Sequence, residues 1–304
     1  MDNFLPIAYF QNQFVPFKDA NVSIATHALH YGTGAFGGLR GMPDPANPNQ
    51  ILLFRLNKHA ARLSNSARLL NFDLPADKIQ ATITEFVKKN KPTTSFYIRP
   101  FVYTSGLGIA PRLHNVEKDF FVYGIELGDY LSPDGVSCRI SSWCRQEDRS
   151  LPLRGKISGA YITSSLAKTE AVESGFDEAI LLNSSGKVSE ASGMNIFIVR
   201  NGTLIAPGFD QDILEGITSD SILTIARDLG IPIVERPVDK SELFIADEVF
   251  LSGTAAKITP VKKIEMYELG RDRPITDKLR EKVMAITENR DAKYADWVFK
   301  VPLD

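Results

Sequence analysis

Four short segments of the 304-residue chain carry residue types that can take part in chemistry together. Lys156 lies in the stretch LRGKISGAY, which we expect to follow a strand and to precede a helix. Glu190 lies in SEASGMNIF, directly before a hydrophobic strand, where we expect its carboxylate to be buried. Residues 214–218 (LEGIT) lead into a predicted helix, and residues 252–255 (SGTA) end a predicted strand with a glycine and a hydroxyl. The segments therefore offer a lysine amine, a buried carboxylate and two turns suited to anions.

Amino transfer with pyridoxal 5′-phosphate (PLP) requires this combination. A lysine amine forms a Schiff base with the cofactor, an anion keeps the pyridine nitrogen protonated, and amides, hydroxyls and an arginine hold the phosphate. Each residue also has a plain structural interpretation. Lys156 and Arg62 can be solvated side chains, Glu190 can form a salt bridge at a strand edge, and Thr218 can be a helix N-cap. Taken alone, these residues predict an enzyme-like α+β protein of two domains with candidate anion sites.

The predicted elements place these segments at strand ends and helix starts. Residues 7–17 predict a hairpin, a loop rich in Pro and Asn at 43–50 precedes a short strand, and helical spacing recurs over 56–70. The other predicted strands are 96–103, 120–127, 136–141, 179–182, 195–199 and 248–251, and the other predicted helices open at Pro75 or cover 161–174 and 218–229. Strands outnumber helices and hairpins join many of them, so we expect an α+β fold without the βαβ alternation of a parallel sheet.

A glycine-rich segment at 32–37 spells GxGxxG, the pattern of dinucleotide-binding turns. That interpretation needs a buried strand before the motif and an acidic residue about 20 positions after it. The preceding residues do not form such a strand, and no acidic residue stands between Asp44 and Asp73. We therefore interpret the segment as a tight turn that lets the backbone approach a neighbour or a ligand.

The composition argues against several classes of function. A net charge of −2, from 35 basic and 37 acidic residues, predicts neither a nucleic-acid nor a membrane partner. The chain starts without a basic leader and has no apolar run near the roughly 20 residues of a membrane span, so a cytoplasmic location is the default expectation. Two cysteines and four histidines lack the spacing of redox or zinc sites, so no metal is expected.

Six segments, in order, resemble those of fold-type IV PLP enzymes and specifically of branched-chain amino-acid aminotransferases. They are HALHYG at 27–32, FYIRP at 96–100, KISGAY at 156–161, SEASGMNIF at 189–197, GIT at 216–218 and DEVFLSGTA at 247–255. The resemblance covers nearly the whole chain, and ordered matches at six separate places are more specific than any single motif.

The resemblance implies a role in cofactor binding for Arg62, Lys156, Tyr161, Glu190, Ile217, Thr218 and Thr254. Lys156 would be the catalytic residue: it would carry PLP and move a proton between the substrate Cα and the cofactor C4′. Tyr161 would bind the phenolic oxygen of PLP, and Glu190 would pair with the pyridine nitrogen. Arg62, the amides of Ile217 and Thr218, and the hydroxyls of Thr218 and Thr254 would hold the phosphate.

The resemblance also implies substrate-binding roles for Tyr31, Phe36, Tyr97, Arg99, Ile109, Tyr130, Thr254 and Ala255. The α-carboxylate would lie at the amides of Thr254 and Ala255 beside Tyr97. Arg99 would accept the side-chain carboxylate of glutamate, because burying a charge without a partner is prohibitive. The remaining residues would form an apolar wall, some of them from the partner subunit of a homodimer.

The fold that the resemblance implies has a small N-terminal α/β domain at 1–126, an interdomain loop at 127–135 and a larger PLP domain at 136–304. The larger domain would hold a mostly β pseudo-barrel with flanking helices. The implied reaction is reversible transamination of L-leucine, L-isoleucine and L-valine with 2-oxoglutarate. A hydrophobic pocket separates one methylene by only about 1–3 kcal/mol, so all three amino acids are expected to be accepted.

The chain departs from the family pattern at four positions. Gly37 stands where relatives commonly have glutamate, Leu127 where a bacterial relative has tryptophan, Ser219 where arginine is usual, and Ala206 where threonine is usual. These departures concern the substrate range rather than the cofactor residues.

Three alternatives share the fold: a D-amino-acid transaminase, an amine transaminase and an aminodeoxychorismate lyase. The segments FYIRP and HALHYG favour the branched-chain group over these. A non-catalytic protein on this scaffold would be expected to lose Lys156 or Glu190, and both are present.

Overall fold

The structure is a computed structural model that describes residues 3–128, 131–132 and 134–303, and the chain forms two compact units. The first unit comprises Met1–Gly128, Gly155–Gly159 and Ala285–Asp304, and the second comprises Asp129–Arg154 and Ala160–Met284. The C-terminal residues, which the sequence placed with the larger domain, thus belong to the first unit. The reason is that β17 (Val298–Pro302) pairs antiparallel with β5 (Asn47–Phe54). By this division, the two units are of nearly equal length.

The first unit holds an antiparallel eight-stranded sheet. Its strands are β1 (Ile7–Phe10), β2 (Gln13–Pro16), β3 (Gly34–Phe36), β4 (Leu39–Asp44), β5, β6 (Phe96–Thr104), β7 (Lys118–Glu126) and β17. They follow the order β17-β5-β4-β6-β7-β1-β2, and β3 pairs with β6. The predicted hairpin of β1 and β2 is confirmed. The predicted loop at 43–50 is wrong, because β4 and β5 continue through most of it as a hairpin.

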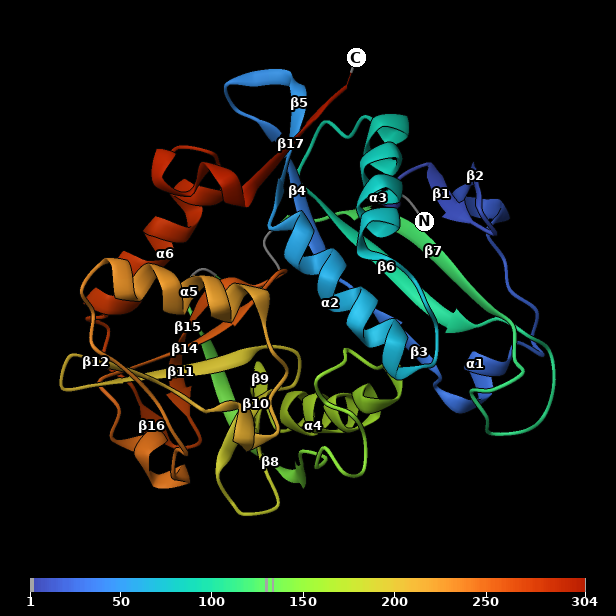
Figure 1. The fold of residues 1–304 in the computed structure, drawn as a ribbon. Coiled ribbons are helices and arrows are strands. Elements are labelled where there is room, and N and C mark those ends of the chain that lie inside the picture. The colour runs from blue at the N-terminus through green and yellow to red at the C-terminus, as the bar shows by residue number, and fades with distance from the viewer. Residues whose placement is uncertain (1–2, 129–130, 133, 304) are drawn as a thin grey trace. The chain divides into compact units, whose positions relative to one another are not determined.

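Helices α2 (Leu56–Leu69) and α3 (Ala76–Asn90) cover one face of this sheet (Figure 1). The buried residues of α2 recur every three or four positions, which gives the helix one apolar face. That face packs into a core that includes Phe86 of α3 and Phe96 of β6. A short helix, α1 (His27–Tyr31), ends at Gly32, whose φ of 63° is the left-handed conformation that glycine adopts most readily. Thus the glycine-rich segment ends α1 at Gly32 and begins β3 at Gly34.

The second unit holds a nine-stranded sheet in the order β10-β9-β8-β15-β14-β11-β12-β13, with β16 paired to β15. The strands are β8 (Val136–Cys144), β9 (Glu178–Leu182), β10 (Val188–Ala191), β11 (Asn195–Arg200), β12 (Thr203–Ala206), β13 (Ile233–Glu235), β14 (Glu248–Gly253), β15 (Lys257–Ile264) and β16 (Tyr267–Glu268). The helices are α4 (Tyr161–Glu173), α5 (Ile217–Asp228) and most of α6 (Pro274–Thr287). The helices predicted at 161–174 and 218–229 are confirmed as α4 and α5 to within a residue or so.

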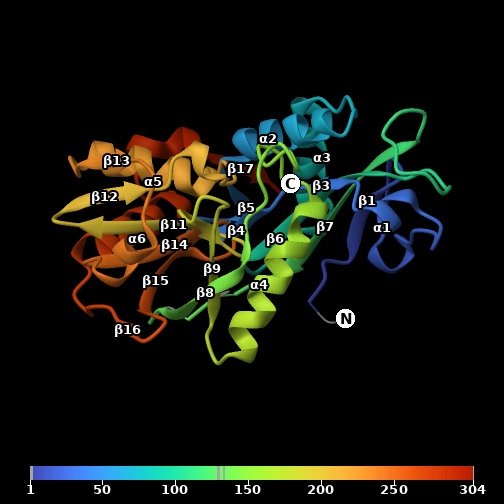
Figure 2. The same cartoon turned by 90° about the horizontal axis from the view of Figure 1, so that it is seen from below.

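Two of the three parallel strand pairs in this unit correct the expectation that βαβ units are missing. Strand β8 pairs parallel with β9, and the chain between them contains α4, which packs against both strands. Figure 2 shows α4 alongside β8 and β9. Strand β12 likewise pairs parallel with β13 across α5. Parallel strands need a long crossover connection, usually a helix, and these two helices supply it. Strand β15 also pairs parallel with β8, and the remaining strand pairs are antiparallel, so the protein stays in the predicted α+β class.

In the described parts of the chain, no helix combines the length and the apolar character needed to span a bilayer.

Candidate active site

The five-residue segment that contains Lys156 packs within the first unit. The backbone N–H of Lys156 donates to the hydroxyl of Ser66 on α2 at 3.1 Å. The Lys156 carbonyl accepts a hydrogen bond from the N–H of Phe36 at 3.0 Å. The main chain at the lysine is therefore fixed from a helix and from a strand, so its half-buried side chain extends from a rigid base.

Phe36 brings this lysine together with two other residues of the predicted site. The Lys156 amine lies 5.1 Å from the centroid of the Phe36 ring, and the Arg99 guanidinium lies 4.5 Å from the same centroid. Arg99 Nη2 donates to the Tyr97 hydroxyl at 3.4 Å. Arg99 and Tyr97 alternate along β6, so both lie on one face of the sheet. We call Lys156, Phe36, Tyr97 and Arg99 the lysine cluster: an amine and a guanidinium share one aromatic ring.

Two glycines shape the backbone beside this cluster. A Cβ atom at Gly38 would lie 1.8 Å from the Tyr97 hydroxyl oxygen, so the tyrosine lies directly against the main chain there. A Cβ atom at Gly37 would lie 2.7 Å from Cγ of Pro100. A glutamate at position 37 would therefore require the Pro100 ring to move. The close approach of Pro100 therefore favours glycine at position 37 in this chain.

A buried histidine, His59, lies among the cations of this unit and was missed by the sequence analysis. Burial lowers the pKa of His59 well below its usual value, and the charges of Arg62, Lys156 and Arg55 lower it further. Its Nδ1 atom is buried without a hydrogen-bond partner among the described residues. His59 precedes Arg62 by one helical turn on α2, and this spacing is the sequence feature that could have indicated that the two side chains are neighbours. The neutral imidazole and the surrounding cations make this region suited to an anion.

The charge state of His59 makes stability depend on pH. Below the unfolded-state pKa of 6.5, the unfolded chain gains a proton at this histidine while the folded chain does not. The free energy of unfolding should therefore fall as the pH drops below 6.5. His59→Gln should lack this contribution, whereas His114→Gln, at an exposed histidine, should keep it. Denaturant titrations at pH 7.5 and 5.5 measure the difference, and equal pH slopes in all three proteins would refute the assignment.

The other substrate residues predicted for the first unit have different surroundings. Tyr31 ends α1, with its ring centroid 4.6 Å from that of His27, which is buried and contacts Thr104 Oγ1 through Nδ1 at 2.8 Å. Ile109 is 96% exposed, so in a single chain it lines no wall, and its role stays a prediction that needs a partner subunit. Tyr130 lies outside the described residues.

In the second unit, Glu190 is buried, as the sequence predicted, and three groups contact its carboxylate. Oε2 accepts hydrogen bonds from Asn195 Nδ2 at 3.1 Å and from the N–H of Leu214 at 3.0 Å. Oε1 lies 2.8 Å from Nη2 of Arg145. Sequence reasoning missed Arg145, because nothing local connects it with a glutamate 45 positions later.

The same contacts lead from Glu190 to the start of α5. Asn195 Nδ2 also donates to the Leu214 carbonyl at 3.0 Å. Its Oδ1 would lie 2.0 Å from a Cβ atom at Gly216, so only glycine fits at the residue before the helix. Gly216 has no side chain to cap the helix, and the first N–H groups of a helix have no partner within it. Ile217 and Thr218, both buried, therefore present backbone donors at the positive end of the helix dipole.

The remaining predicted cofactor and substrate residues of this unit lie at element ends. Tyr161 is the half-buried first residue of α4. Thr254 and Ala255 follow β14 directly and are half-buried.

Among the departures, Ala206 is buried at the end of β12 and Ser219 lies in the first turn of α5. Leu127 follows β7, and its carbonyl accepts a hydrogen bond from Arg40 Nη2 at 3.0 Å.

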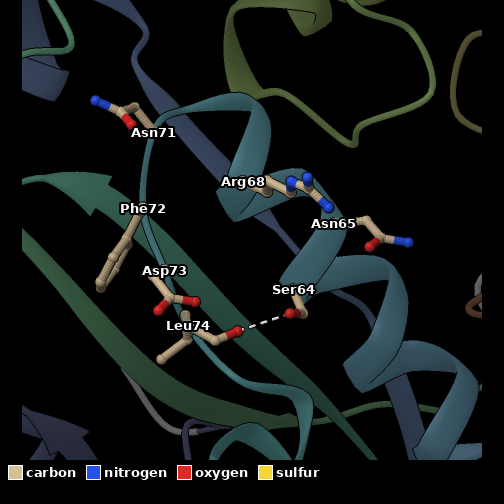
Figure 3. A pocket seen from close by; sticks show the side chains of 7 residues that line it. All are labelled: Ser64, Asn65, Arg68, Asn71, Phe72, Asp73 and Leu74. Atoms are coloured by element: carbon tan, nitrogen blue, oxygen red, sulfur yellow. Dashed lines mark hydrogen bonds between the residues drawn. The ribbon is translucent and has the colours of Figure 1, made fainter.

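A separate hollow of about 390 Å³ lies at the C-terminal end of α2. Figure 3 shows its lining residues, which are Ser64, Asn65, Arg68, Asn71, Phe72, Asp73 and Leu74. None of them is a predicted site residue. The Ser64 hydroxyl donates to the Leu74 carbonyl at 2.7 Å and so ties the helix to the chain that follows it. In the described residues, no three His, Cys, Asp or Glu side chains gather as a metal site.

Comparison with known proteins identifies relatives over the full chain. Residues 41–264 match the family described as Amino-transferase class IV. A protein of Synechocystis sp., named probable branched-chain-amino-acid aminotransferase, is 73% identical over 304 residues and all of both chains.

Two solved structures are similar over nearly all of this chain. One is a branched-chain aminotransferase from Thermoproteus uzoniensis with norvaline, at 37% identity and a TM-score of 0.93, covering 97% of this chain and 99% of that chain. The other is a branched-chain amino acid aminotransferase from Thermobaculum terrenum in its PLP-form, at 33% identity and a TM-score of 0.92, covering 99% of both chains.

Proposed function

The chain belongs to the amino-transferase class IV family, and we propose that it transaminates L-leucine, L-isoleucine and L-valine with 2-oxoglutarate, using PLP. The observation that carries the proposal is the lysine cluster, in which an amine and a guanidinium share one aromatic ring. Such a cluster combines a nucleophilic amine with an apolar surface and with one cation for a substrate carboxylate.

The residues present fit a PLP group. In the second unit, the uncapped amides of Ile217 and Thr218 offer donors to an anion. In the first unit, the cations around His59 favour a negative charge. At the ring nitrogen, the buried Glu190 carboxylate, held beside Arg145, offers an acceptor. We propose that Lys156, Arg62, Tyr161, Glu190, Ile217, Thr218 and Thr254 hold the cofactor.

When bound, PLP supplies an electron sink for the bonds at the substrate Cα. The chain's own residues position the reactants and move protons. The Lys156 amine takes the proton from Cα, and the rigid main chain at this residue keeps the amine within reach. Glu190 holds a proton at the ring nitrogen by accepting its hydrogen bond. Thr254 and Ala255 bind the substrate α-carboxylate.

The pocket has to accept both an aliphatic and an acidic side chain. Phe36 provides apolar surface, and the Arg99 guanidinium over its ring provides a cation for a carboxylate. Arg99 Nε is buried and lacks a hydrogen-bond partner among the described residues, which is costly unless a ligand supplies one. We propose that the side-chain carboxylate of glutamate or 2-oxoglutarate is that partner.

Arg99→Ala should separate the two substrate classes. We expect kcat/KM for L-glutamate to fall roughly 100-fold, because the carboxylate loses its buried partner. We expect kcat/KM for L-leucine to change less than about tenfold, because the aliphatic side chain needs only the apolar surface. Arg112→Ala, at an exposed arginine, is the control. Equal losses for both amino acids would rule out this role of Arg99.

A substrate panel tests the function itself. The purified holoenzyme should lose the visible absorbance of its bound cofactor on addition of L-leucine and should turn over L-leucine with 2-oxoglutarate. D-alanine and simple amines should give no turnover. Turnover of D-alanine without turnover of L-leucine would establish the D-amino-acid alternative instead.

A homodimer is proposed on the surface of the first unit. Ile24, Leu29, Leu107 and Ile109 are all more than 60% exposed. They lie on two neighbouring segments, joined where the Nε2 atom of His27 contacts the Ala110 carbonyl at 2.7 Å. An exposed apolar patch of this kind is typical of an interface. Ile109→Asp should shift the sedimentation of the protein toward the monomer.

The cytoplasmic location remains a prediction from the sequence.

A further inference from the structure

Arg145 is a buried arginine directly after β8, paired with the glutamate of the proposed cofactor site. Its Nη2 atom lies 2.8 Å from Glu190 Oε1, with the side chains 7% and 8% exposed. The Arg145 N–H donates to the Leu182 carbonyl at 2.8 Å, which fixes the arginine main chain on the end of β9. The guanidinium is therefore held in place from the sheet.

The same guanidinium has a second contact. Its Nε donates to the Asp212 carbonyl at 3.1 Å. Two residues further along, the Leu214 N–H donates to the other carboxylate oxygen of Glu190. The chain at 212–214 is thus tied both to the arginine and to the glutamate, and α5 begins three residues after it. Asp212, whose pKa is raised mainly by burial, also interacts electrostatically with Arg145.

A buried carboxylate without a cationic partner tends to take up a proton and become neutral. Arginine is suited to prevent this, since its planar fork can serve the carboxylate and a carbonyl at the same time, whereas the single nitrogen of lysine is a point charge. A buried ion pair adds little net stability compared with apolar residues of the same size. Stability alone therefore does not account for this pair.

We propose that Arg145 is a positioning residue for the cofactor: it keeps Glu190 ionised for the ring nitrogen and fixes residues 212–214, which set the start of the phosphate-binding helix α5. The inference rests on the proposed function. Both the ring-nitrogen acceptor and the phosphate-binding amides then depend on one guanidinium.

Two variants and a matched control test this in the holoenzyme. Arg145→Met removes the charge at similar volume, and Arg145→Lys keeps a charge without the fork. The control is Arg139→Met, because Arg139 lies on β8, the strand that Arg145 follows, and contacts Glu170 and Ser174 instead. For each protein we would measure the affinity for PLP, the affinity for a PLP analogue with carbon in place of the ring nitrogen, and the pH profile of the bound-cofactor absorbance.

Arg145→Met should weaken PLP binding roughly 10- to 100-fold, as expected for losing a charged hydrogen-bond partner. The loss should be several-fold smaller for the carbon analogue, and the pH profile should shift. Arg145→Lys should recover the pH profile and still bind both cofactors more weakly than the wild type. A merely structural role would weaken both cofactors equally and would leave the pH profile in place.

The proposal is overturned if Arg145→Met matches Arg139→Met in all three measurements. If Arg145→Met does not fold, Arg145→Lys decides: wild-type affinity for both cofactors would overturn the proposal. Failure of the proposed function would be distinguishable, because the wild-type protein would then neither take up PLP nor react with L-leucine.

Discussion

Lys156→Ala should abolish steady-state transamination, with a loss of at least about 10³-fold, because the amine that takes the Cα proton is removed. The neighbouring structure should survive, since the hydrogen bonds of this segment with Ser66 and Phe36 are made by the main chain of the lysine. Some PLP should stay bound through its phosphate. Steady-state rates with L-leucine and cofactor content after gel filtration measure both effects.

Lys187→Ala is the matched control. Lys187 pairs with Asp239 near the surface, and its loss should leave the rate unchanged. Near-normal activity of Lys156→Ala would show that another amine does the chemistry, and the proposed mechanism would have to be abandoned.

Glu190→Ala should slow the half-reaction with L-leucine roughly 100-fold or more, because the ring nitrogen would lose the anion that keeps it protonated. It should also destabilise the protein by about 3–5 kcal/mol, because Arg145 would be left as an unpaired buried charge. Stopped-flow absorbance measures the half-reaction, and denaturant unfolding measures the stability. Glu190→Gln should keep the volume of the side chain and should still slow the half-reaction with L-leucine.

A second buried carboxylate separates these two effects. Glu248 accepts hydrogen bonds from the N–H groups of Ile275 and Thr276 at the start of α6, in the same unit as Glu190. Glu248→Ala should therefore lower stability without slowing the half-reaction of the folded protein. If Glu190→Ala lost only stability, Glu190 would be a structural residue and its assignment to the ring nitrogen would be wrong.

Local patterns were enough to predict the elements with strong periodicity. The apolar spacing of α2 and the run of aromatic and β-branched residues in β6 are local features of the sequence, and the structure has both elements. The hairpin of β1 and β2 likewise needs only a short turn. Elements after residue 255, including β15 and α6, were not predicted.

Long-range pairings were the part that sequence could not predict. Local sequence identifies β8 by its alternation and β9 by its apolar residues, but it does not reveal that the two strands run parallel across α4. The 43–50 segment looked like a loop because of its Pro and Asn residues, yet pairing with neighbouring strands overrode those local preferences. The sequence also offers nothing to place residues 155–159 with the first unit.

The candidate site shows the same contrast between local features, which the sequence predicts, and long-range contacts, which it does not. Family motifs identified the position of Lys156, Glu190 and the start of α5, because each lies in a recognisable segment. The charged partners of these residues are distant in sequence. Arg145 contacts Glu190 across 45 positions, and the charge of Lys156 lowers the pKa of His59 across 97 positions. Roles that depend on the partner subunit, such as that of Ile109, need the assembled protein.

The pairing of β17 with β5 has a consequence for how the chain is made. A ribosome synthesises residues 298–302 about 250 residues after β5. During most of synthesis, the edge of β5 that later pairs with β17 is therefore unpaired. An exposed edge of this kind is a template for wrong pairing, and such distant contacts form slowly. The first unit would therefore finish last although it begins first, and the nascent protein would depend most on chaperones while its second half is still being translated.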